Sequence, residues 1–161
     1  MRTFIIFRHA KAVQEGASSD RERELTDKGR KAARAMGRLA REQDQVPDAV
    51  LCSTATRARE TFALFAEGCH YEGRVEFIDE LYLAPPAAYV EAARRLGRDA
   101  ERLMVVGHNP GLEGLLDELT ASSESLPTAA LAVCELPIET WDAMGGKRKG
   151  LLKALWRPKE L

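Results

Sequence analysis

The chain has 161 residues, 45% hydrophobic and 30% charged, and this length and composition predict a single globular domain over residues 1–161. Its formal net charge of −1 argues against a general nucleic-acid binder, so any anion site must come from a local cluster of cations. No apolar segment approaches the roughly 20 residues that a membrane-spanning helix needs, and we expect no contact with a membrane.

The first part of the chain combines an apolar run, a polar loop and a helical pattern. Phe4–Phe7 has aromatic and β-branched residues, which predicts a buried strand, and it is too short for the apolar region of a signal peptide. Segment 11–24 has no periodicity and predicts a charged surface loop. A helix then opens near Thr26, which suits its N-cap, and the apolar stripe of this helix ends before Pro47.

Apolar runs and helical patterns continue to alternate along the chain. Ser53 and Thr54 are suited to capping the helix after the second strand, and Pro110 suits the first turn of a later helix. The predicted strands are Ala49–Cys52, Val75–Ile78 and Leu103–Val106, and the predicted helices run to about Glu67, from Pro85 and Pro86 through Leu96, and over Gly111–Leu119.

The C-terminal part of the chain changes character. Ala129–Leu136 and Gly150–Trp156 predict strands, with a turn region at Gly145–Lys147 between them. Because no long helix separates these two strands, we expect them to pair in antiparallel fashion. The whole pattern predicts an α/β fold, a three-layer α/β/α sandwich whose mostly parallel sheet ends in antiparallel C-terminal strands.

Polar side chains follow three of the predicted strands where each strand ends. Arg8 and His9 follow the first, Ser53–Thr61 follows the second, and Gly107–Asn109 follows the fourth. Parallel strands have their carboxyl ends at one sheet edge, where open α/β sheets bind ligands, so we expect these loops to converge. Two histidines, at least two arginines and two helix N-termini would then suit a phosphoryl group in transfer. Taken alone, His9 is explained equally well as a strand-end residue that caps a loop.

In their order and spacing, these residues resemble the histidine phosphatase superfamily. Arg8-His9-Ala10, the Ser53–Thr61 segment and Val106–Asn109 carry this resemblance. The closest branch is that of the short bacterial SixA-type phosphohistidine phosphatases. The likeness runs from about residue 3 to the C-terminus, and it implies a phosphoglycerate mutase-like fold. The segments similar to the SixA-type branch are Arg23–Gly29, Leu81–Leu83 and Leu126–Ala130.

The resemblance implies a role for each of four residues. His9 would attack phosphorus and form a phosphohistidine intermediate, which divides one displacement into two easier ones. Arg8 and Arg57 would clamp the phosphoryl oxygens, and His108 would hydrogen-bond one of them. For attack, one nitrogen of His9 must be unprotonated while the other donates to a carbonyl, and neighbouring cations should lower the pKa of the ring.

The remaining site candidates are weaker, and two of them concern departures from the superfamily pattern. Ala10 stands where the commonest motif has glycine, and alanine does not adopt a positive φ cheaply, although the SixA-type branch accepts it. Larger superfamily members use a carboxylate as general acid, for which Glu80 or neighbouring Asp79 is the candidate here, with a loop-fixing role for Glu80 as the alternative. Thr26 and Asn109 are further candidates for phosphate contact.

Several other residues have an ordinary structural explanation beside a functional one. Arg21 and Arg23 could reach the phosphate or a protein substrate, or could form surface ion pairs. Arg59 fits a solvated helix surface better than a substrate contact, and His70 fits an exposed loop. Lys147–Lys149 is typical of an exposed hairpin tip.

We expect neither a metal ion nor a cofactor. His9 and His108 could ligate a metal, but no carboxylate or cysteine partners stand at suitable spacing, and the neighbouring arginines would repel a cation. The chain also lacks the GxxxxGK[ST] loop of nucleotide triphosphatases. The three cysteines form no CxxC pair, which argues against a disulfide framework or a structural zinc site and indicates a reducing, cytoplasmic location.

The preferred hypothesis is a metal-independent phosphohistidine phosphatase that acts in signalling. A chain with little room for an inserted cap should have an open site that accepts a protein-borne phosphoryl group. The expected partners are a phosphorylated protein, for instance a histidine-phosphotransfer domain, or a small phosphorylated substrate, with a phosphate ion in the site. Two alternatives stay open, a phosphatase for small phosphate esters or nucleotides that uses Glu80 as its acid, and a non-catalytic phosphoprotein-binding module.

Overall fold

One mixed sheet organises the molecule. In the computed structural model, which describes residues 1–160, six strands lie in the order β3-β2-β4-β1-β5-β6. The four strands β3, β2, β4 and β1 run parallel, whereas β5 and β6 are antiparallel to their neighbours. The strands are β1 (Arg2–Arg8), β2 (Ala49–Ser53), β3 (Arg74–Ile78), β4 (Arg102–Gly107), β5 (Leu131–Leu136) and β6 (Leu151–Trp156).

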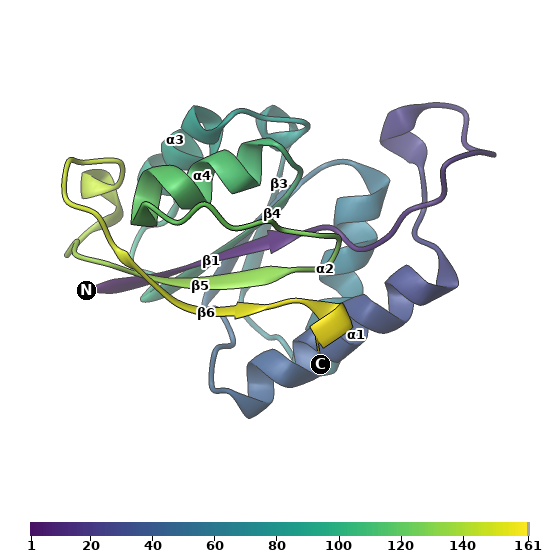
Figure 1. Cartoon of the computed structure of the whole chain (residues 1–161), viewed down its shortest axis with the longest axis horizontal. Helices are drawn as coiled ribbons and strands as arrows, with labels where there is room; N and C mark the ends of the chain where they lie inside the picture. The colour runs from purple at the N-terminus through teal and green to yellow at the C-terminus, as the bar shows by residue number, and fades with distance from the viewer. Residues whose placement is uncertain (161) are drawn as a thin grey trace.

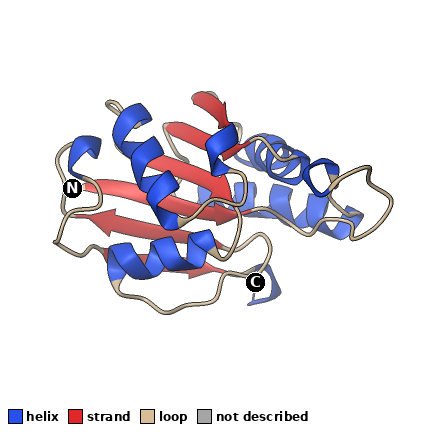
Figure 2. Ribbon diagram, turned by 90° about the horizontal axis from the view of Figure 1, so that it is seen from above, coloured by secondary structure: helices blue, strands red, loops and turns tan. Residues whose placement is uncertain are grey.

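Helices cover both faces of the sheet and complete a three-layer sandwich. Figure 1 shows α3 (Pro86–Leu96) and α4 (Gly111–Thr120) on one face, with α1 (Asp27–Glu42) and α2 (Thr56–Cys69) on the other. Figure 2 shows the same layers from above. The side chains of β1 alternate between two cores, because successive residues of a strand point to opposite faces. Phe4 and Ile6 pack with the α3/α4 side, and Ile5 and Phe7 pack with the α1/α2 side.

The α/β fold predicted from the sequence is therefore confirmed, including the antiparallel C-terminal strands. Thr26 is the N-cap of α1, and its side chain accepts a hydrogen bond from the Gly29 N–H at 3.0 Å. The predicted caps of α2 were wrong. Ala55 takes the N-cap position, and the hydroxyl of Ser53 accepts a hydrogen bond from its N–H at 3.3 Å.

The connecting segments contain short 3-10 helices that the sequence pattern did not predict. The first, η1, lies inside the segment predicted as a loop, and η3 lies between β5 and β6. None of the described helices is long and apolar enough to cross a membrane. The short helices are η1 (Asp20–Glu22), η2 (Asp79–Leu81), η3 (Trp141–Ala143) and η4 (Pro158–Glu160).

Strand register brings three loops to the same level of the sheet. Arg8 pairs with Gly107 across β1 and β4, and Cys52 pairs with Val106 across β2 and β4. The loops that follow these strands begin at His9, Thr54 and His108 and therefore lie at one edge of the sheet. Gly107 is required there because a Cβ at this position would collide with the hydroxyl of Tyr89.

Candidate active site

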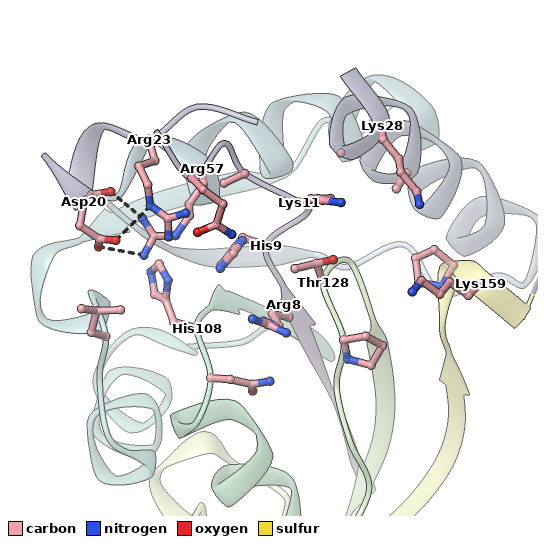
Figure 3. Close-up of a pocket in the computed structure, with 18 residues that line it drawn as sticks. Arg8, His9, Lys11, Asp20, Arg23, Lys28, Arg57, His108, Thr128 and Lys159 are labelled. Carbon is pink, nitrogen blue, oxygen red and sulfur yellow. Dashed lines mark hydrogen bonds and ion pairs between the residues drawn. The ribbon is translucent and has the colours of Figure 1, made fainter. Parts of the chain in front are cut away.

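The carboxyl edge of the parallel strands opens into a cavity of about 520 Å³. Arg8, His9, Arg57 and His108 all line this cavity, so the structure brings together the four residues that the sequence analysis placed in one site. Figure 3 shows them grouped, with Asp20 and Arg23 to one side. The rings of His9 and His108 have centroids 5.2 Å apart.

Backbone hydrogen bonds hold His9 on two sides. Its N–H donates to the Gly107 carbonyl of β4 at 3.1 Å, and its carbonyl accepts from the Ala129 N–H at 3.0 Å. The Nδ1 atom of the ring lies 2.7 Å from the Ala10 carbonyl oxygen, which can only accept a hydrogen bond. Nδ1 therefore carries the proton, and the lone pair of Nε2 remains available.

Burial keeps the His9 ring neutral. The side chain is 7% exposed, and this burial is the largest cause that lowers its pKa to about 3. The Ala10 hydrogen bond acts in the opposite direction, and the charges of His108, Arg57 and Arg8 lower the pKa further. The expectation that neighbouring cations lower this pKa holds, although burial contributes more than they do.

Ser53 holds the ring of His108 through its Nε2 atom. Nε2 lies 2.8 Å from the hydroxyl of Ser53, and that hydroxyl also accepts the Ala55 N–H. A serine hydroxyl has one donor hydrogen and two acceptor lone pairs, so this contact is compatible with either tautomer of the neutral ring. Burial and then the charge of Arg57 lower the pKa of His108 to about 4. Its Nδ1 has no hydrogen-bond partner among the described residues.

The two arginines approach the histidines from different elements. Arg8, at the end of β1, donates from Nη1 to the Leu126 carbonyl at 3.0 Å, and burial lowers its pKa. Arg57 is only 2% exposed although it lies in the first turn of α2, where the helix dipole disfavours a positive charge. The Nε atoms of both guanidinium groups are buried and have no partner among the described residues.

Asp20 offsets the charge of Arg57, a contact that the sequence analysis did not predict. Its backbone carbonyl and its Oδ2 accept from the two terminal nitrogens of Arg57 at 2.8 and 3.2 Å. The carboxylate also accepts from the hydroxyl of Tyr82 and, at 3.0 Å, from Nε of Arg23. The Tyr82 hydrogen bond is the first cause, and Arg57 a further one, that lowers the pKa of Asp20 to about 2.

Thr61 joins the loop after β1 to α2. Its hydroxyl accepts the Ala10 N–H at 2.9 Å and donates to the Arg57 carbonyl at 2.6 Å, and the side chain is fully buried. The peptide that holds Nδ1 of His9 is thereby tied to the helix that carries Arg57. The only signal in the sequence was the place of Thr61 in the Ser53–Thr61 motif.

The weaker site candidates divide into those near the cavity and those outside it. Asn109 lines the cavity, and its Nδ2 donates to the Leu126 carbonyl at 2.8 Å. Thr26 caps α1 and does not line the cavity. Glu80 is exposed and lies outside the cavity, and Asp79 is paired with Arg21 at 2.5 Å, also outside it. Neither carboxylate that the sequence offered as a general acid reaches the site, because η2 turns both toward solvent.

The structure also shows where the other residues considered in the sequence analysis lie. Ala10 is fully buried, and its φ is not positive, so alanine suits this turn as well as glycine would. Arg23 lines the cavity, whereas Arg59 is exposed and stacks on Phe77. His70 is exposed at the C-cap of α2. Within residues 1–160 no three histidine, cysteine, aspartate or glutamate side chains form a group that could hold a metal ion.

Comparison with known proteins places this geometry in a family. Residues 4–81 match the model of the histidine phosphatase superfamily, branch 1. The uncharacterized protein Rv1276c of Mycobacterium tuberculosis is 34% identical over 137 residues, which cover 78% of this chain and 84% of that protein.

Solved structures extend the similarity to the whole chain. A protein from Nakamurella multipartitia assigned as phosphohistidine phosphatase SixA has a TM-score of 0.82 and 28% identity, with coverage of 98% of this chain and 96% of that one. A counterpart from Agrobacterium tumefaciens gives 0.81 and 26%, with coverage of 98% and 99%. The structure of the protein histidine phosphatase SixA complexed with tungstate has a TM-score of 0.84 at 23% identity, with coverage of 98% of both chains.

The chain belongs to the histidine phosphatase superfamily. Within that superfamily the SixA-type branch, recognised from the sequence, is confirmed by the structures from Nakamurella and Agrobacterium.

Proposed function

We propose that this chain is a phosphohistidine phosphatase that uses His9 as its nucleophile and needs no metal ion. The observation that carries the proposal is the state of His9. Its Nδ1 proton is committed to the Ala10 carbonyl, its pKa is lowered to about 3, and its Nε2 lone pair lies in a cavity lined by Arg8 and Arg57. A neutral imidazole beside two fixed cations is suited to attack on an anionic phosphoryl group.

The proposed reaction has two displacements. The Nε2 lone pair of His9 attacks phosphorus, the phosphorus–nitrogen bond of the substrate breaks, and the substrate imidazole, which enters protonated on its other ring nitrogen, takes the bond pair and leaves neutral. Water then attacks the phosphorus, the bond to Nε2 breaks, and the proton of the water is released with phosphate. Arg8, Arg57 and the ring of His108 would donate to the phosphoryl oxygens in both steps, since charge on these oxygens is what the site must stabilise.

The carboxylates of the site favour an imidazole leaving group over an alkoxide. Asp20 is the one carboxylate among the described residues that lines the cavity, and its pKa of about 2 keeps it ionised at neutral pH. It therefore has no proton to give to a leaving oxygen, and Glu80 and Asp79 lie outside the cavity. Imidazole leaves with far less help from a general acid than an alkoxide does. The SixA assignments of the similar structures point to the same substrate class.

A trapping experiment tests the nucleophile. The chain is mixed briefly with a histidine-phosphotransfer domain that carries a radiolabelled phosphohistidine, and the reaction is quenched in alkali. We expect an alkali-stable, acid-labile phosphoenzyme in the wild type and in His70→Ala, whose exposed imidazole lies outside the cavity. We expect none in His9→Ala, and label retained by that variant would overturn the mechanism.

A substrate panel tests the leaving group. Phosphate release is measured from phosphohistidine, phosphoserine, phosphotyrosine and sugar phosphates, each with a chelator present. We expect phosphohistidine to be turned over fastest, with no loss of rate in the chelator. Equal rates on the esters would favour the small-ester phosphatase, and phosphopeptide binding without phosphate release over hours would favour a binding module.

A further inference from the structure

The cavity is larger than a phosphoryl group requires. Its volume of about 520 Å³ lies in the range of pockets that enclose drug-sized ligands. The four residues of the phosphoryl site line only one part of it. In Figure 3, Lys11, Lys28 and Lys159 lie on the side of His9 opposite Asp20, with Thr128 between them and the phosphoryl site. The cavity thus continues past the reacting phosphorus toward a second group of cations.

These three lysines come from separate segments of the chain. Lys11 follows the nucleophile loop, Lys28 lies in the first turn of α1, and Lys159 lies in η4 near the end of the described chain. Strand β6 delivers η4 to the side of α1, so residues far apart in sequence reach one cavity (Figure 1). The cavity is also lined by small or apolar side chains, namely Ala12, Ala32, Pro127 and Pro158.

The charge of the cavity contrasts with that of the chain. The chain as a whole has a net charge of −1. The cavity is lined by six arginine and lysine side chains against one carboxylate, a net excess of five positive charges. Asp20 already pairs with Arg57 and Arg23. No ion pair joins Lys11, Lys28 or Lys159 to a carboxylate of the described residues, so their ammonium groups are available to a ligand.

We propose that Lys11, Lys28 and Lys159 form a second anion subsite, which selects substrates that carry another negatively charged group beside the phosphoryl group. In a phosphoprotein this group would be an acidic side chain near the phosphohistidine, and in a small molecule it would be a second phosphate. Both offer the same chemistry to an ammonium group, an anionic oxygen. The inference rests on the proposed function, which places the phosphoryl group at His9. It adds that the three lysines favour those substrates that carry a second anionic group.

Two phosphohistidine peptides of equal length test the subsite, one with aspartates beside the phosphohistidine and one with asparagines at those positions. We expect the wild type to favour the acidic peptide in kcat/KM, with a loss of about fivefold for each lysine changed to glutamine. In the triple variant Lys11→Gln, Lys28→Gln, Lys159→Gln the preference should disappear. Raising the salt from about 0.05 to 1 M should weaken it in the wild type, because exposed charges are screened.

The matched control removes the same charge elsewhere. Lys31, Lys147 and Arg148 are exposed, lie outside this cavity and can be changed together to glutamine. We expect this control to keep the preference for the acidic peptide. An unchanged preference in the cavity variant, or an equal loss in the control, would overturn the subsite. Thermal unfolding of each variant verifies that it is folded.

A binding measurement separates this inference from the proposed function, since it needs no turnover. An alkyl monophosphate and an alkanediyl bisphosphate of the same chain length are compared by calorimetry. Tighter binding of the bisphosphate, lost in the cavity variant, supports a subsite that accepts small molecules. Preference for the acidic peptide alone identifies a protein substrate as the source of the second anion. Absence of both preferences refutes the subsite even where His9 still forms a phosphoenzyme.

Discussion

Substitution of Asp20 by asparagine should weaken the fold and strengthen anion binding at the same time. Asp20 supplies the only carboxylate that pairs with Arg57 among the described residues, and that guanidinium is almost fully buried. The asparagine keeps the shape and an amide oxygen as acceptor but removes the charge. In the wild type, an oxyanion that binds Arg57 competes with the Asp20 carboxylate for the same guanidinium group. The variant lacks this competing charge.

The magnitude follows from the exposure of the two partners. Removing one partner of a fully buried ion pair costs about 3 to 5 kcal/mol, but the Asp20 side chain is 48% exposed, so we expect about 1 to 2 kcal/mol. For a chain of this size that corresponds to a decrease in Tm of about 3 to 6 °C. Affinity for phosphate or tungstate should rise about fivefold to tenfold, because one opposing charge at close range is removed.

The sign of the pH dependence provides a further check. The pKa of Asp20 is lowered from its ordinary value of 3.8 to about 2 in the folded chain, so its stabilising effect is complete above the unfolded value. It is lost as the pH falls from about 4 toward 2. The stability difference between wild type and Asp20→Asn should therefore be constant near neutral pH and shrink only below pH 4.

Thermal unfolding with and without tungstate measures both effects. The matched control is Asp79→Asn, which breaks the exposed pair with Arg21 outside the cavity and should change neither quantity by more than a small amount. Unchanged or weaker tungstate binding by Asp20→Asn would refute the idea that Asp20 competes for Arg57. An equal effect in Asp79→Asn would show that the change in tungstate binding comes from the net charge of the protein and not from the contact of Asp20 with Arg57.

Three further predictions concern His9 and the residues around it. In NMR spectra of the imidazole nitrogens His9 should remain about 99% neutral at pH 5 with its proton on Nδ1, whereas a midpoint near 6.5 would contradict the effect of burial. Thr61→Val should lower kcat about 10- to 100-fold and stability by about 1 to 3 kcal/mol, because it releases the Ala10 peptide; a wild-type rate would exclude this positioning role. Gly107→Ala should destabilise the chain by about 1 to 3 kcal/mol in denaturant unfolding, and less in a Tyr89→Phe background, since the Tyr89 hydroxyl meets the added Cβ; an identical loss in both backgrounds would contradict the clash.

Much of the fold could be predicted because its signals are local. The apolar runs of β1, β2 and β4 and the Thr26 cap each depend on neighbouring residues, and all of them appear in the structure within a few residues of the expected bounds. The prediction that Ser53 and Thr54 cap α2 was wrong for a reason that is not local. Ser53 is the last residue of β2, Ala55 takes the N-cap position, and the hydroxyl of Ser53 also lies 2.8 Å from Nε2 of His108, which follows β4 and is 55 positions away in the sequence.

In the candidate site, too, the features with a local signal in the sequence were predicted and those that depend on distant contacts were not. The order of the motifs was enough to place Arg8, His9, Arg57 and His108 together, because parallel strands present their carboxyl ends at one edge. Asp20 was missed because it lies in a segment without periodicity, and its contacts with Arg57 and Tyr82 span many residues. Glu80 is exposed and lies outside the cavity, which its place directly after a strand could not indicate.

The sequence by itself determined the α/β class, the family and the four residues that line one cavity at the sheet edge, since periodicity and motif order are carried along the chain. Only the tertiary structure decided the electrostatics of those residues. The tautomer of His9, the low pKa values of both histidines and the charge balance at Arg57 depend on burial and on partners that the fold brings from elsewhere. The lysines that extend the cavity likewise meet only because β6 carries the C-terminal segment back to α1.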